Sequence, residues 1–131
     1  MQVLDLDDLL TELRRRHWTL LRWGDAKAPY LVAAIYQWDT CTDVLVLRSE
    51  HDATAFRGLT WPESNVFAPE KVSYQYHACA VWTLRAILAL PAPGSLGCPA
   101  SIETPHAKCF IPPHLPRPIM IRPLSQHQRA P

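Results

Sequence analysis

A chain of 131 residues, of which 48% are hydrophobic and 19% charged, holds enough apolar material for the core of one domain. Its net charge of +1 provides no overall field that would attract nucleic acid or an anionic membrane surface. No run reaches the roughly 18 apolar residues of a membrane-spanning helix, and the acidic start differs from a signal peptide, so we expect a cytoplasmic protein with reduced cysteines.

The first predicted element is a helix over residues 6–16. Asp5 is a suitable N-cap, and the arginines at 14–16 complement the helix dipole at the other end. A run of arginines can bind phosphate, but it is more often a solvated helix end. The apolar stripe of this helix has the spacing i, i+3, i+4, i+7 and consists of Leu6, Leu9, Leu10 and Leu13.

Three strands are predicted next, over residues 18–23, 30–38 and 43–48, because aromatic and β-branched residues dominate there between turn-rich segments. The second and third strands are apolar on both faces, so the sheet needs a covering layer on each side. We expect the N-terminal helix to cover one face and a later element to cover the other.

The middle of the chain is predicted to be a structured loop over residues 49–69 with one helical turn at 52–57. Residues 72–77 alternate as a strand, although Pro69-Glu70 can also open one long helix that ends at Leu90. Residues 78–90 are rich in helix formers, and Pro91 stops that helix.

The predicted fold is therefore α+β: a small, mostly antiparallel sheet of three to four strands, an N-terminal helix and a second helix near residues 78–90. This domain spans residues 1–90, and an extended, proline-rich C-terminal segment spans residues 91–131. Proline excludes most regular structure from that segment. We expect it to be partly docked on the domain, with a mobile end at Ser125–Pro131, through four apolar anchors: Phe110, Ile111, Ile119 and Ile121.

Two groups of residues carry weak signals for chemistry involving cysteine or metal. The ligand types of a zinc site occur at Cys98, His106, Cys109 and His114, but no close Cys pair pre-forms one edge of the site, and prolines stiffen the connections. His77 and Cys79 share one face of a strand that Cys41 can approach, yet no glycine-rich oxyanion turn accompanies them. We predict no metal and no cofactor.

Acidic residues bracket the third predicted strand and offer a carboxylate pair for acid–base work. Asp39 can meet Asp43 across a turn, and Glu50 can meet Asp52 beside His51. Turn and cap roles explain these side chains equally well. The sequence contains no phosphate-binding glycine loop, dinucleotide fingerprint or nucleophile elbow.

Aromatic residues at the ends of elements either cap the core or contribute to an interface, and the second interpretation gives the leading hypothesis, since Trp is enriched in binding hot spots. We expect a non-enzymatic module that binds a protein partner or a second copy of itself as a homodimer. Two alternatives stay open: a small hydrolase or nuclease that uses a His/carboxylate or His/Cys pair, and a metal- or nucleic-acid-binding accessory protein, although the acidic domain disfavours nucleic acid. The candidate binding residues are Trp23, Trp38, Trp61 and Phe67.

Overall fold

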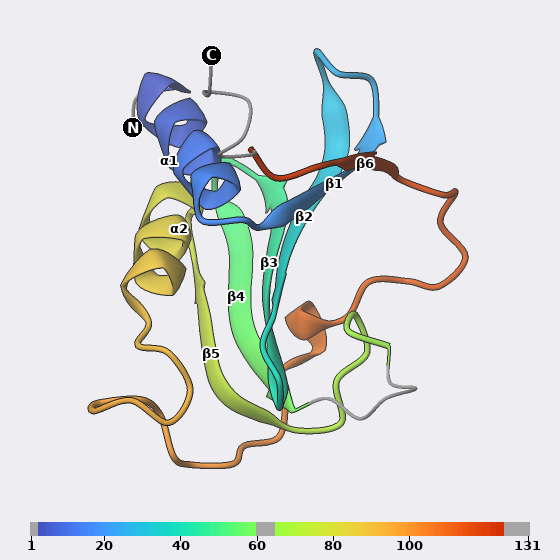
Figure 1. Ribbon diagram of the computed structural model, residues 1–131. Coiled ribbons are helices and arrows are strands. Elements are labelled where there is room, and N and C mark those ends of the chain that lie inside the picture. Colours follow the sequence, from blue (N-terminus) through green and yellow to red (C-terminus); the bar gives the residue numbers. More distant parts are fainter. Residues whose placement is uncertain (1–2, 60–64, 125–131) are drawn as a thin grey trace.

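The computed structural model describes residues 3–59 and 65–124, with side chains from Asp7 onward (Figure 1). The α+β class and the antiparallel sheet are confirmed, but the described residues form six strands instead of the expected three to four. The elements are α1 (Val3–Arg15), β1 (Thr19–Gly24), β2 (Pro29–Gln37), β3 (Cys41–Ser49), β4 (Asp52–Leu59), β5 (Val72–Ala78), α2 (Ala80–Ala89), the 3-10 turn η1 (Ala107–Cys109) and β6 (Ile119–Ile121).

The sheet is an antiparallel meander of β1 to β5, to which β6 is added beside β1. Its strand order is β5-β4-β3-β2-β1-β6, so β5 and β6 are the two outer strands. β6 comes from the proline-rich segment and pairs over three residues, with Ile119 opposite Arg22 and Ile121 opposite Leu20.

The expected helical turn at residues 52–57 is wrong, because these residues form β4. Glu50 and His51 make a two-residue turn that folds β4 back onto β3, and residues 53–58 are buried. Alanine at 53 and 55 favours a helix by local propensity. In a strand paired on both sides, small side chains leave room for the helix above, and tertiary packing overrides that propensity.

The alternative of one long helix ending at Leu90 is also wrong, since the chain changes from β5 to α2 at Cys79. The backbone of Cys79 is extended, with φ of −68° and ψ of 165°, so a single helix cannot run through this residue. α2 buries Val81, Leu84 and Ile87 at helical spacing and ends before Pro91.

α1 ends in a Schellman motif that uses histidine where glycine is usual. His17 has a positive φ of 70°. The amide of Trp18 donates to the carbonyl of Leu13, and the amide of His17 donates to that of Arg14. The side chains of Leu13 and Trp18 meet in the core, as this motif favours. The cap turns the chain into β1.

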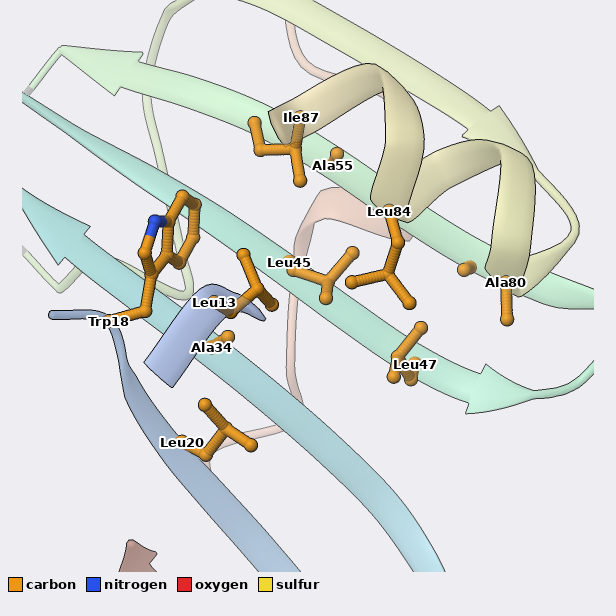
Figure 2. Close-up of a cluster of buried hydrophobic side chains, with 11 residues drawn as sticks. Leu13, Trp18, Leu20, Ala34, Leu45, Leu47, Ala55, Ala80, Leu84 and Ile87 are labelled. Atoms are coloured by element: carbon orange, nitrogen blue, oxygen red, sulfur yellow. The ribbon is translucent and has the colours of Figure 1, made fainter. Parts of the chain in front are cut away.

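Both helices cover the same face of the sheet, so the later element expected on the opposite face is not α2 (Figure 1). Figure 2 shows this core, in which Leu13 of α1 and Leu84 of α2 lie over Leu45 of β3. The opposite face is covered by the 65–67 loop and the C-terminal segment, through residues that include Phe67, Cys109, Ile111 and Leu115.

The four expected anchors of the C-terminal segment differ in their burial. Ile111 is 7% exposed and its amide donates to the carbonyl of Phe67, and Ile121 packs half-buried beside the helix-side core. Phe110 and Ile119 are 40% and 53% exposed, so neither is buried as an anchor. The expected mobile end at Ser125–Pro131 lies outside the described residues. None of the helices described is both long and apolar enough to cross a membrane.

Candidate functional site

The three predicted aromatic binding residues that the structure describes, Trp23, Trp38 and Phe67, do not form one surface. Trp23 is only 5% exposed, packs edge-on against Phe67 at 6.2 Å, and donates from its indole nitrogen to the carbonyl of Pro116. This ring belongs to the core that holds the C-terminal segment, which corrects its expected place at a surface. Trp38 is half-buried, and Trp61 lies outside the described residues.

Trp38 belongs to a buried polar cluster on the helix side of the sheet. Asp43 accepts two hydrogen bonds from Arg57, at 2.6 and 2.9 Å, and one from the indole of Trp38 at 2.9 Å. Arg57 also donates to the carbonyl of Pro91 at 2.8 Å. Burial opposes the charge on Arg57, but the hydrogen bonds and charge of Asp43 outweigh it and raise the pKa of Arg57. The pair is therefore a fully engaged structural ion pair.

A cavity of about 250 Å³ opens beside Asp43, between the sheet and the C-terminal end of α2. Trp18, Tyr36 and Trp38 line it as neighbouring rings, with centroids 5.9 and 4.8 Å apart. Because Asp43 already accepts three hydrogen bonds, it is not a free base. Asp39 is exposed, and within the described residues no hydrogen bond joins it to Asp43.

His51, the other histidine considered for acid–base work, lies in the exposed turn between β3 and β4. Its backbone amide donates to the hydroxyl of Ser49. Asp52, its expected acidic neighbour, instead contacts Arg48 at 3.6 Å and Lys108 at 3.3 Å. Asp52 therefore links Lys108 of η1 to the sheet.

The expected His77–Cys79–Cys41 group is not assembled. Cys79 caps α2 with its carbonyl, which accepts from the hydroxyl and amide of Thr83. Cys41 lies at the far end of the sheet, opposite Leu59, whereas His77 lies opposite Thr54. No thiol reaches the histidine from β3.

His77 instead forms the centre of a hydrogen-bond network under the C-terminal segment. Its Nδ1 lies 3.0 Å from the hydroxyl of Thr54, and its Nε2 lies 3.2 Å from Oε1 of Gln75. Oε1 of Gln75 also accepts from the amide of His106, so the nitrogen that faces it must be the donor. His77 is therefore the Nε2–H tautomer, and Thr54 donates to Nδ1.

The same network clasps residues 103–109 onto β5. The side-chain amide nitrogen of Gln75, Nε2, donates to the carboxylate of Glu103 and to the backbone carbonyl of Thr104. Burial lowers the pKa of His77; neighbouring His106 and the positive charges of Lys108 and Arg48 lower it further, and Asp52 opposes them. The fold therefore favours the neutral form of His77.

The four weak zinc candidates lie in the described residues and do not converge. Cys109 is buried, with its Sγ 3.7 Å from Gln75, and burial raises its pKa to about 11. His106 accepts through Nδ1 from the amide of Lys108, and His114 is exposed. The part of the chain that the structure describes contains no group of three His, Cys, Asp or Glu residues placed to hold a metal.

The outer edge of β5 is the feature that the sequence did not single out. β5 pairs with β4 on one side, and on its other side only Val72 is paired, through two backbone hydrogen bonds to Glu103. No further backbone partner lies along that edge within residues 3–59 and 65–124. Tyr76, at the middle of the open stretch, is 36% exposed.

The helix that borders this strand also presents an exposed aromatic ring. Trp82 of α2 is 58% exposed, and the guanidinium of Arg85 lies 5.5 Å from its ring centroid. Trp and Arg are the residues most enriched in binding hot spots. The sequence offered one signal for this surface, a run over residues 72–78 that lacks proline and any Lys, Arg, Asp or Glu.

Comparison of the chain with family models, with curated proteins and with solved structures found no match.

Proposed function

We propose that this chain is a non-enzymatic protein-binding module that takes up an extended strand along the outer edge of β5. Strand addition is a common mode of protein recognition, in which backbone hydrogen bonds supply affinity and side chains supply specificity. The observation that carries the proposal is an outer strand of seven residues whose outer side is paired only at Val72 within the described chain.

The contrast between the two outer strands supports this function. Proteins protect exposed strand edges with proline, with charge or by keeping the strand short. β6 has three residues, and Pro118 and Pro123 flank it. β5 has seven residues and contains no proline or charged residue; its pairing with β4 shifts once near Val72, and beyond Val72 no backbone partner is described on its outer side. An open edge of this length is expected to be covered by a partner.

The engaged state of the polar side chains favours binding over catalysis. The two clusters that could supply a base are centred on Asp43 and His77. Asp43 accepts three hydrogen bonds, and both ring nitrogens of His77 are occupied. A small hydrolase or nuclease needs such a group free to face substrate. The four cysteines are unpaired, and we propose a reducing compartment, the cytoplasm, as the site of action.

Binding of a strand peptide tests this proposal directly. The probe is a fluorescein-labelled heptapeptide that copies residues 72–78, and the control peptide carries proline in place of the central glutamine. We expect the fluorescence anisotropy of the first peptide, but not of the control peptide, to rise to saturation as protein is added. Tyr76→Lys should bind the first peptide more weakly. Tyr30→Lys is the matched control, because Tyr30 is 53% exposed and lies on β2, away from the edge. Equal binding of both peptides would refute strand addition at β5, and so would binding of neither peptide to a chain that sedimentation velocity shows to be monomeric.

A further inference from the structure

We infer that the strand taken up by β5 is the β5 of a second copy, so that two chains form a two-fold symmetric dimer with one continuous sheet. This inference rests on the proposed function and names its partner. Three features support it: the two ends of the open edge of β5, the side chains of β5, and the short β6 strands that remain as the outer edges of the joined sheet.

The open edge has two fixed ends, and a second β5 fits between them. At one end the backbone of Glu103 occupies the outer side of Val72. At the other end the chain leaves the sheet at Cys79 and starts α2. An antiparallel second copy centred on Tyr76 places Val72 of one chain at the level of Ala80 of the other. Each strand therefore ends where the Glu103 bridge of the other chain begins.

The side chains of β5 are compatible with themselves in this register. Tyr76 lies opposite the second copy's Tyr76, and Gln75 lies opposite the second copy's His77. Aromatic pairs and neutral polar pairs across strands are stabilising, whereas like charges directly opposite are not. No Lys, Arg, Asp or Glu occurs within β5, so the two-fold pairing brings no like charges together on the strand.

The same two-fold axis brings the α2 helices together. An axis perpendicular to the sheet keeps α1 and α2 of both chains on one face. α2 contacts β5 as well as β4 and β3, so the two α2 helices flank the new strand pair.

Closure explains why the association stops at two. A heterologous contact between sheet edges can grow into a fibre, whereas an isologous contact uses the same surface on both chains and closes. Pairing through β5 consumes both open edges. The remaining edges of the joined sheet are the two short, proline-flanked β6 strands, which resist further pairing.

Sedimentation velocity and targeted cross-linking of the full chain test this inference. The wild type should be a dimer across the micromolar range. Tyr76→Lys should weaken dimerisation by about tenfold or more, because it removes an aromatic pair and places two positive charges directly opposite each other. Tyr30→Lys should dimerise as the wild type does. The melting temperature and far-UV circular dichroism of each variant show whether it is folded.

Cross-linking at the two-fold axis keeps the inference falsifiable if Tyr76→Lys does not fold. Under mild oxidation, Tyr76→Cys should form a covalent dimer faster than the wild type or Tyr30→Cys. A monomeric wild type would overturn the inference but leave strand addition standing if the β5 peptide still binds. A dimer that is insensitive to Tyr76→Lys and not trapped by Tyr76→Cys would overturn the register and the interface together.

Discussion

Breaking the buried ion pair of Asp43 and Arg57 should destabilise the protein more than most single substitutions. The two side chains are 4% and 3% exposed. In Asp43→Ala, the Arg57 guanidinium keeps, among the described residues, only the carbonyl of Pro91 as a hydrogen-bond acceptor, and the indole of Trp38 loses its acceptor. Removing one partner of a buried pair costs about 3–5 kcal/mol. A loss of that size is a large part of the stability of a domain.

Urea unfolding followed by circular dichroism measures the effect and separates charge from packing. Asp43→Ala should lower the free energy of unfolding by about 4 kcal/mol. The double variant Asp43→Leu with Arg57→Met removes both charges and keeps apolar volume, so it should be markedly more stable than the single variant. A single variant that loses less than about 1 kcal/mol would show that the pair is solvated. A double variant as unstable as the single would show that packing, and not an unpaired charge, causes the loss.

Three further predictions concern the helix cap, the clasp and the buried thiol. His17→Gly should raise the free energy of unfolding by about 1 kcal/mol, because glycine adopts positive φ without a Cβ penalty, and a loss of stability would contradict the cap. Because burial and nearby positive charge lower the pKa of His77 in the fold, stability should be complete above about pH 6.5 and decline below it. His77→Gln should reduce that decline more than His51→Gln does, as measured by urea unfolding across pH, and equal slopes would refute the role of His77. Cys109, whose pKa is raised to about 11, should react with a thiol reagent at neutral pH far more slowly than half-buried Cys98, and rapid labelling in the native state would show that the segment is not docked.

The sequence was informative where local pattern and tertiary environment agree. The leucine spacing of α1 and the aromatic and β-branched runs of β1 to β3 predicted those elements within a few residues. β4 was missed because Ala53 and Ala55 have helical propensity, and their packing between two strands depends on residues far along the chain. The place of Trp23 was missed for the same reason, since its partners Phe67 and Pro116 are distant in sequence.

The candidate site could not be predicted from local pattern because it is defined by pairing. Whether a strand is central or outer depends on the order of all strands in the sheet. Because β6 adds beside β1, β1 becomes a central strand, and β6 and β5 are the outer ones. Residues 72–78 therefore carry the composition of an unprotected edge without revealing that they form one. Similarly, Gln75 and His77 are ordinary strand residues until the C-terminal segment meets them.

The C-terminal segment links the two edges of the sheet and sets the length of the open one. It supplies β6, which covers the edge of β1, and it supplies Glu103, which occupies the first position on the edge of β5. Glu103 is held there by Gln75, whose Oε1 accepts from Nε2 of His77. Burial and the charges of Lys108 and Arg48 disfavour a protonated His77, so protonation would cost the fold stability. Because Glu103 occupies the outer side of Val72, the proline-rich segment limits how much of β5 a second strand can reach.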